Sequence, residues 1–225
     1  MYRFIIFLIL PTFLFSQNKV DEQGRKQGKW IQTHENGKVR YEGSFQNDKP
    51  NGLFLYYTET GILKANIEYF NQGTSASARL YHPNGKVSAV GVYQNEQKDL
   101  LWKYYDEKGQ LIRDENYNDG LLHGQSILYY SNGVIFQKSN YENGLKQGLQ
   151  KQFYKNGTLR LSSHYKDNKL DGDYTLFYSN GVKNHHGRYQ NDLKQGVWNY
   201  YKSDASLDYE VIYENSIPQN TPIDE

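Results

Sequence analysis

The residues of this sequence that could do chemistry are aromatic rings set at a fixed spacing. One ring column recurs at multiples of 24 residues, and a tyrosine column follows two residues later. Such rings can stack on sugars, on bases or on other side chains. The predicted binding residues are Trp30, Phe54, Trp102, Tyr174 and Trp198 of the first column and Tyr56, Tyr104 and Tyr200 of the second. The same rings could instead hold a sheet together, and both interpretations stay open at this point.

Signatures of catalysis and of metal binding are weak. His185 and His186 are adjacent, and adjacent strand residues point to opposite faces, so the pair cannot bind one metal ion together. The segment 171–173 carries two aspartates but lacks the series of ligands of a calcium loop. No nucleophile motif occurs. We therefore expect no catalytic residue, no metal site and no cofactor, and we expect that the protein is not an enzyme.

The rings belong to a repeat of 24 residues. A second glycine column, from Gly37 to Gly181, and an aromatic column, from Phe45 to Tyr213, run in phase with them. Columns that share one period across most of a chain indicate a tandem array rather than one globular domain. The structural repeat glycines of the first glycine column are Gly28, Gly52, Gly124, Gly148, Gly172 and Gly196.

Each unit reads as one β-hairpin followed by a connecting turn. Asn36-Gly37 and its counterparts predict tight hairpin turns of type I′, with positive φ at both central residues. A second turn follows Phe45, and we expect a four-residue loop that places Phe45 opposite Gly52. The predicted fold is all-β: a single-layer antiparallel β-meander of tandem 24-residue hairpin repeats, elongated and curved by sheet twist.

Pairing across the hairpin turns assigns the faces of this sheet. Trp30 lies opposite Gly43, and directly opposed residues share a face, so one face carries the predicted binding rings and the other is mostly polar. We expect the repeat glycines to lie beneath the aromatic column, because a ring can cover the bare backbone of a strand glycine. A side chain at Gly148 would then push Tyr141 and Tyr165 off the sheet.

Composition limits the classes of function. Of the 225 residues, 37% are hydrophobic and 16% aromatic, against about 45–50% apolar residues in ordinary domains. There is no cysteine, so neither disulfides nor thiol chemistry are available. The formal net charge is +1 (26 basic and 25 acidic residues) and falls to 0 when Arg3 is removed with a leader. This balance argues against nucleic acid and anionic membranes as partners.

The ends of the chain differ from the array. Arg3 precedes an apolar run over 4–15 that is shorter than the roughly 20 residues of a membrane span, which predicts a signal peptide over 1–16. Cleavage near Ser16 would release a periplasmic or secreted protein without a membrane span. We expect an N-terminal cap over 17–24, eight repeat units over 25–216 and a disordered tail over 217–225. Ala76 and Leu100 replace repeat glycines, which indicates either a hinge or simple sequence drift.

Two stretches carry a resemblance to a known family. The segment 41–52 has Tyr-x-Gly-x-Phe followed by turn residues and a glycine, and it resembles the MORN repeat, as does the segment 186–196. Units without Tyr-x-Gly, such as 138–141, resemble the bacterial MORN-variant repeat, which occurs in exported proteins and in proteins labelled as antitoxins of toxin–antitoxin pairs. The resemblance covers roughly residues 25 to 216. It implies a single-layer antiparallel sheet that binds partners along a groove, and it implies no reaction.

These observations lead to two functional hypotheses of different class. The first is an exported, non-enzymatic and antitoxin-like scaffold that binds a protein or peptide along the aromatic groove or along a sheet edge. The second is a glycan-binding envelope module that uses rows of Trp and Tyr as stacking platforms.

Overall fold

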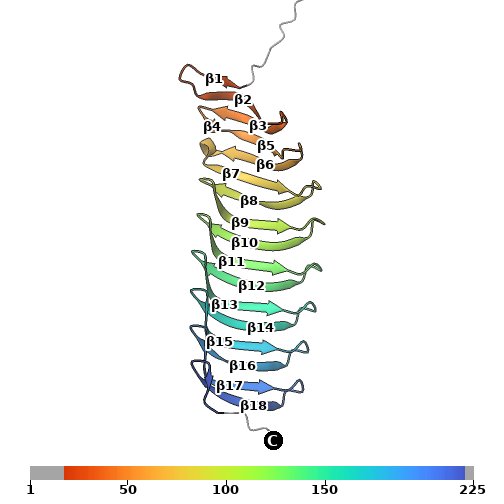
Figure 1. Ribbon diagram of the computed structural model, residues 1–225, viewed down its shortest axis with the longest axis vertical. Helices are drawn as coiled ribbons and strands as arrows, with labels where there is room; N and C mark the ends of the chain where they lie inside the picture. The colour runs from red at the N-terminus through yellow and green to blue at the C-terminus, as the bar shows by residue number, and fades with distance from the viewer. Residues whose placement is uncertain (1–17, 221–225) are drawn as a thin grey trace, which may run out of the picture.

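The computed structural model describes residues 18–220. Its nineteen strands form one antiparallel sheet in which successive strands pair, except that β4 and β5 both pair with β3. The strands stack along the long axis, from β1 at one end to β18 at the other (Figure 1). The predicted single-layer antiparallel β-meander is confirmed.

Within residues 18–220 the elements follow the expected order of hairpins. They are β1 (Lys19–Val20), β2 (Lys26–Thr33), β3 (Val39–Gln46), β4 (Lys49–Pro50), β5 (Gly52–Tyr57), β6 (Leu63–Phe70), the 3₁₀ helix η1 (Asn71–Gly73), β7 (Ser75–Tyr81), β8 (Val87–Gln94), β9 (Gln97–Tyr105), β10 (Leu111–Asn118), β11 (Leu121–Tyr129), β12 (Ile135–Glu142), β13 (Leu145–Phe153), β14 (Leu159–Lys166), β15 (Lys169–Phe177), β16 (Lys183–Gln190), β17 (Leu193–Tyr201), β18 (Leu207–Glu214) and β19 (Ile217–Pro218). No helix in this part of the chain is long and apolar enough to cross a membrane.

The Asn-Gly turns differ from the predicted type I′ form. In the first of them, the Gly37 N–H donates to the carbonyl oxygen of His34 at 3.0 Å. Gly37 has a φ of +81°, whereas Asn36 is not in the left-handed region. This geometry is a three-residue loop whose glycine forms a bulge. A second irregularity follows in the return strand, where Thr33 pairs with Val39 and Gln32 with Tyr41, so that Arg40 is left over. It shifts the pairing by one residue and restores the expected facing beyond it.

The type I′ turns lie instead between the repeats. Asn47 and Asp48 have φ values of 52° and 66°, and Phe45 pairs with Pro50 across them. The connecting loop therefore has two residues, and the predicted facing of Phe45 and Gly52 is wrong. Asn and Asp lead these turns because they tolerate the left-handed conformation better than other residues with a side chain.

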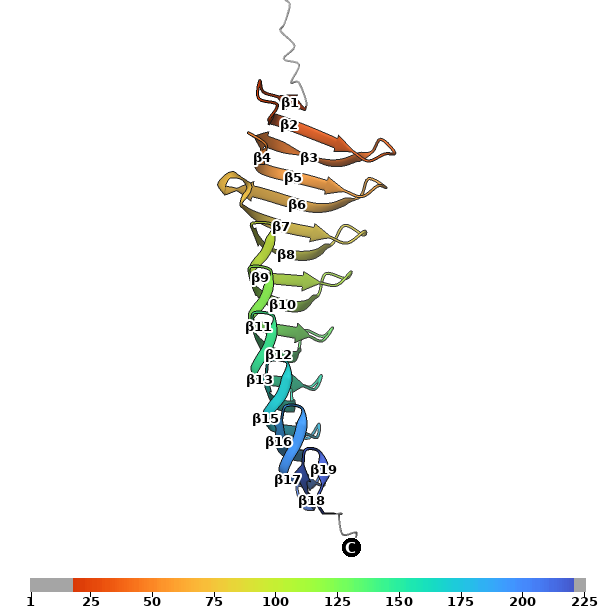
Figure 2. The ribbon, with the colours of Figure 1, turned by 60° about the vertical axis from the view of Figure 1, so that its left-hand side comes forward.

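The repeat glycines bend the strands. On one side of the bend Glu115 pairs with Ser126, and on the other Tyr117 pairs with Leu122. Between these two pairs the strand that carries Gly124 has three residues where its partner has one. This is a β-bulge, and bulges of this kind bend a strand. In the strands from β9 to β17, the ribbon on the side of the connecting turns runs steeply along the long axis, while the other part of each hairpin runs across it (Figure 2). Positive φ values between 66° and 121° are shared by Gly28, Gly52, Gly124, Gly148, Gly172 and Gly196.

Backbone conformation is the reason for these glycines. A Cβ added to Gly148 would meet no atom within 4 Å, so the predicted collision with Tyr141 and Tyr165 is wrong. Leu100 occupies the same column with a φ of 56°, a conformation that costs a residue with a side chain roughly 1–2 kcal/mol. The array keeps the bend even where the glycine is missing.

The third unit lacks the bend. β6 and β7 pair without a register shift from Phe70–Ser75 to Ala65–Leu80, and Ala76 has no positive φ. The helical turn η1 lies where other units have only the two-residue turn. The strand ladder continues through units three and four, so the irregular sequence changes the bend and does not interrupt the sheet.

Both ends of the described chain belong to the sheet. β1, in the expected cap, pairs with Lys26 and Gln27 of β2. At the other end Tyr213 pairs with Pro218, so the prediction of a disordered tail is wrong for Ile217–Pro218. The expected signal peptide over 1–16 and the last residues, 221–225, lie outside the described part.

Candidate functional site: an aromatic trough

The face that carries the five rings of the first predicted column is the inside of a trough. We call it the ring face. A flat single layer would leave these rings open to water, yet Trp102 and Trp198 are 0% exposed and Phe54 is 1% exposed. The bends bring one wall over them: Lys98, before the bend in β9, places its Nζ 4.9 Å from the ring centroid of Trp102, after the bend.

A single line of residues crosses the floor of the trough from strand to strand. We call it the central row, and each member faces the next across a strand pair. Its members are Trp30, Gly43, Phe54, Ile67, Ala78, Gly91, Trp102, Glu115, Ser126, Ser139, Gln150, Ser163, Tyr174, Gly187, Trp198 and Val211. Most of these residues are buried, so the row is the core of the array.

Where the central row holds a large ring, the preceding member is often a bare glycine. A Cβ added to Gly91 would overlap the Trp102 ring, and the same holds for Gly187 and Trp198. Gly43 stands in this relation to Phe54. None of these three glycines has a positive φ, so the requirement here is steric. The indole of Trp102 is also anchored, because its Nε1 donates to the Val92 carbonyl oxygen at 2.9 Å.

In the middle of the array the central row is polar. Glu115, Ser126, Ser139, Gln150 and Ser163 follow one another, and all are buried. The Ser139 hydroxyl donates to Gln150 Oε1 at 3.2 Å and accepts from Gln137 Nε2 at 3.0 Å. The Ser163 hydroxyl, 0% exposed, has no hydrogen-bond partner among the described residues.

Glu115 places a carboxylate in this core. The Tyr117 hydroxyl donates to Glu115 Oε2 at 2.7 Å, and the Nε of Arg113 lies 3.4 Å from Glu115 Oε1. Burial raises the pKa of Tyr117, and its hydrogen bonds to Tyr104 and Glu115 raise that pKa further. The hydroxyl therefore stays protonated and acts as a donor. This arrangement holds the carboxylate in place.

The remaining predicted binding rings are partly accessible. Trp30, Tyr174 and the second-column tyrosines Tyr56, Tyr104 and Tyr200 are half-buried. The second-column hydroxyls bond to hydroxyls of the aromatic column; for example, those of Tyr56 and Tyr69 are 3.1 Å apart. Ligand contact by these five rings stays a prediction. The buried rings of Phe54, Trp102 and Trp198 offer no stacking surface, which removes the strongest platforms of the glycan hypothesis.

The two candidate histidines have structural surroundings. His185 packs on the ring face against Tyr174 and Tyr200, at centroid distances of 5.8 and 5.4 Å. Burial, and then the charges of Lys194 and His186, lower the pKa of His185. His186 lies on the other face, where its Nε2 is 3.1 Å from the Tyr201 hydroxyl. Across residues 18–220 no three His, Asp or Glu side chains gather as metal ligands would.

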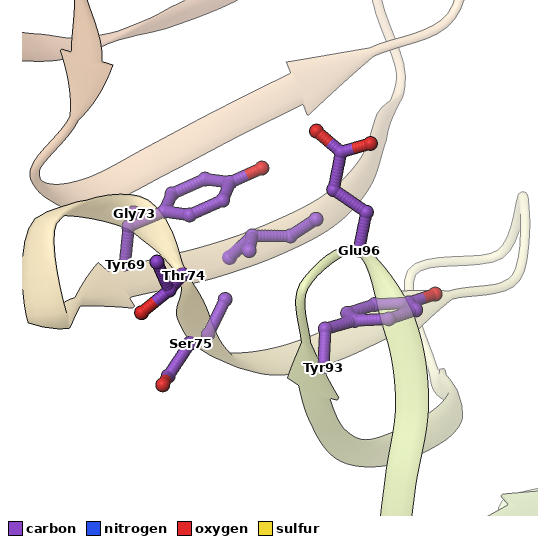
Figure 3. Close-up of a pocket in the computed structure, with 8 residues that line it drawn as sticks. Tyr69, Gly73, Thr74, Ser75, Tyr93 and Glu96 are labelled. Atoms are coloured by element: carbon purple, nitrogen blue, oxygen red, sulfur yellow. The ribbon is translucent and has the colours of Figure 1, made fainter. Parts of the chain in front are cut away.

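One cavity opens into the trough beside the third unit. Its volume is about 280 Å³. Figure 3 shows Tyr69 and Tyr93 on its walls and Glu96 at its edge. The lining residues are Ile67, Tyr69, Gly73, Thr74, Ser75, Ala76, Tyr93 and Glu96.

Comparison with protein families identifies the repeats. The model of the MORN repeat variant matches residues 26–47, 98–119, 122–143 and 146–167. The chain carries MORN-variant repeats. Each matched segment of this MORN-variant array covers one hairpin, with its two strands and the turn between them. No curated protein matches the chain.

Solved structures share local likeness with the MORN-variant array. The crystal structure of TarM is 11% identical over 52% of this chain and 20% of TarM, with a TM-score of 0.27. The GtfA/B complex bound to UDP and GlcNAc is 19% identical over 61% and 22%, with a TM-score of 0.21. TcdB2-TccC3-TEV is 13% identical over 84% and 12%, with a TM-score of 0.24. The chain thus spans about a fifth or less of these proteins, and such scores carry no functional argument.

The sequence analysis did not predict that glycines lie directly against the large rings of the central row. It also did not predict the polar part of that row. A usable signal was present in the MORN-variant repeats. Gly43, Gly91 and Gly187 each stand eleven residues before a Phe or Trp of the first ring column, and Ile67 stands eleven before Ala78. A small residue in one column therefore matches a large residue in the other. This match of small and large residues, eleven positions apart, indicates that the two residues touch across neighbouring units. Each column taken separately carries no such signal.

Proposed function

We propose that this protein is an exported, non-enzymatic repeat scaffold that binds a protein or peptide partner in its trough. The observation that carries the proposal is the trough itself, a concave face lined by half-buried tyrosines and aliphatic side chains that holds an open cavity. Concave apolar surfaces with a few polar groups are the usual form of binding sites. An antitoxin-like role is one form of this function, with an exported toxin as the partner.

The trough is a better binding surface than the edges of the sheet. Strand addition needs a long free edge with unpaired backbone groups. The terminal strands β1 and β19 have two residues each, and such short edge strands are a common protection against strand addition. The near-neutral charge of the chain also favours a partner recognised by shape and apolar contact over a polyanion.

The test is capture of a partner by matched surface variants. Purified protein would be incubated with envelope and culture-supernatant fractions of the producing organism. The trough variant Leu122→Asp/Leu170→Asp changes two half-buried leucines of the trough wall, and the control Leu53→Asp/Leu149→Asp changes two exposed leucines of the opposite face. Circular dichroism would establish that both variants fold.

We expect the wild type and the control to retain one saturable protein partner and the trough variant to lose it. Equal capture by the two variants, or the absence of any saturable partner, would contradict the proposal. Export is tested separately, by fractionation of cells that express the full chain or a chain lacking residues 1–16. Retention of the full chain inside the cell would contradict export.

A further inference from the structure

The wall of the trough is filled by long side chains at regular positions, and one position has a small side chain instead. Along this wall each tyrosine of the aromatic column pairs with a spacer residue in the strand that follows it. From Tyr93 to Tyr213 the spacers alternate lysine and leucine: Lys98, Leu122, Lys146, Leu170 and Lys194. Between Tyr69 and Tyr93 the spacer is Ala76, so the long side chain that fills the wall elsewhere is missing there.

The lysine spacers show what this wall accepts. Their ammonium groups lie over tyrosine rings: Lys98 Nζ is 5.2 Å from the centroid of Tyr117. The corresponding distances are 4.4 Å for Lys146 over Tyr165 and 4.6 Å for Lys194 over Tyr213. Each stem lies along the apolar wall while the ammonium faces the ring, a favourable cation–π geometry.

Two small residues, one on the wall and one on the floor of the trough, leave a cavity at this position. Because the third unit lacks the bend, Ala76 rather than Thr74 faces Tyr69 and Tyr93. In the central row Ala78 stands where the fourth unit has Trp102. Both positions of the floor and wall are therefore small, and the cavity of about 280 Å³ lies between the two tyrosines.

Glu96 gives this cavity a charge. Asp48, Asn168 and Asp192 hold the corresponding turn position in other units, and each accepts the backbone N–H of the residue beside it in the neighbouring strand. Glu96 makes no such bond, since the Thr74 N–H donates to the Asn71 carbonyl oxygen. The Glu96 carboxylate has no hydrogen-bond or ion-pair partner among residues 18–220 and stands at the edge of the cavity (Figure 3).

We propose that this cavity receives a lysine side chain of the partner polypeptide, with its stem over Ala76 and its ammonium between the rings of Tyr69 and Tyr93 and the carboxylate of Glu96. The inference rests on the proposed function and specifies the chemistry of the partner. The partner lysine would complete the pattern that the chain's own lysines form in other units. A leucine would fit the shape of the wall, but it would leave the Glu96 carboxylate without a counter-charge.

The test uses three short blocked peptides, acetyl-Gly-Lys-Gly-amide and its Nε-acetyl-lysine and leucine counterparts. Each is titrated into the full protein with isotope-labelled tyrosine, and the ring signals of Tyr69 and Tyr93 are assigned from Tyr69→Phe and Tyr93→Phe. We expect the lysine peptide to shift both signals saturably and at least fivefold more tightly than the other two peptides. Equal binding of all three, or no shift at Tyr69 and Tyr93, would overturn the proposal.

Two variants and a control complete the design. Thr74→Lys supplies an internal lysine beside the cavity and should weaken binding of the lysine peptide at least tenfold. Glu96→Gln should weaken it about threefold to tenfold and remove the preference over leucine. Thr158→Lys makes the same change in a distant hairpin turn and should leave binding unchanged.

The variants also separate this inference from the broader proposal. In the capture experiment, a Thr74→Lys protein that retains the partner overturns the lysine site and leaves the scaffold function standing. If the wild type captures no partner, the scaffold function fails, while the peptide titration still decides whether the cavity recognises lysine.

Discussion

The central row is built in two ways, and the two ways obey different rules. From Trp30 to Trp102 large rings lie on glycines, and where the ring is replaced by Ala78 the neighbour is Ile67. From Glu115 to Ser163 the same positions are polar and equally buried. The first region is held by complementary volumes and the second by hydrogen bonds between buried groups. A trough one layer thick therefore accepts either kind of core if each contact between neighbouring units is complete.

The largest effect should come from removing a fully buried ring. Trp102→Ala leaves a cavity over Gly91, and large-to-small changes of this kind cost about 3–5 kcal/mol. Trp30→Ala should cost clearly less, because Trp30 is half-buried near the end of the array. Urea unfolding of the two variants measures the difference. Equal costs would show that burial in the trough does not determine how much a ring contributes to the free energy of unfolding.

Volume complementarity can be tested by exchanging one pair for another. Gly91→Ile alone should destabilise, because its side chain overlaps the Trp102 ring. Gly91→Ile combined with Trp102→Ala recreates the natural pair Ile67 and Ala78. The double variant should be more stable than Trp102→Ala alone, with a favourable coupling of about 1–3 kcal/mol. Additive effects across the four proteins of this double-mutant cycle would contradict the interpretation.

In the polar region the rule is completeness of hydrogen bonding. Ser139→Ala removes a hydroxyl that both donates and accepts. It should cost about 1–2 kcal/mol because the buried amide of Gln150 and the half-buried amide of Gln137 each lose a partner. Ser163→Ala removes a buried hydroxyl without a partner among the described residues and should be neutral or stabilising. Denaturant midpoints measure both changes. The reverse order would mean that the polar row is held by something other than these bonds.

The smallest effect concerns the bend that both regions share. Leu100→Gly should stabilise the array by about 1 kcal/mol, since it removes the side chain from a left-handed position. Ala76→Gly is the matched change at the unit without a bend, and it should destabilise by roughly 0.5–1 kcal/mol through chain entropy. Thermal unfolding of both variants provides the measurement. A gain from Ala76→Gly would show that the third unit is a strained form of the same bend.

Much of the architecture followed from the sequence because strand pairing is local. The 24-residue period predicted the hairpins, and the spacing from Trp30 to Gly43 gave the correct facing because side chains alternate along a strand. Both turn types were predicted wrongly. Asn-Gly fits a type I′ turn as well as the three-residue loop with a glycine bulge that the structure has, and the connecting loop has two residues where four were expected. The register shift between Gln32 and Thr33 restored the expected pairing, so the faces were right although the turn was not.

The tertiary structure alone decided which rings are buried and where the trough is open. Burial of Trp102 depends on the bend that brings Lys98 of its own strand over it, and on Tyr93 of the preceding strand, whose ring centroid lies 4.9 Å from that of Trp102. The cavity likewise depends on the register between β6 and β7, which places Ala76 rather than Thr74 beside Tyr69 and Tyr93. The sequence by itself determined period, pairing and faces, because these depend on alternation within one hairpin. The burial of the rings and the opening of the cavity depend on the bends of successive units and on contacts between units. Such contacts exist only once the array has folded.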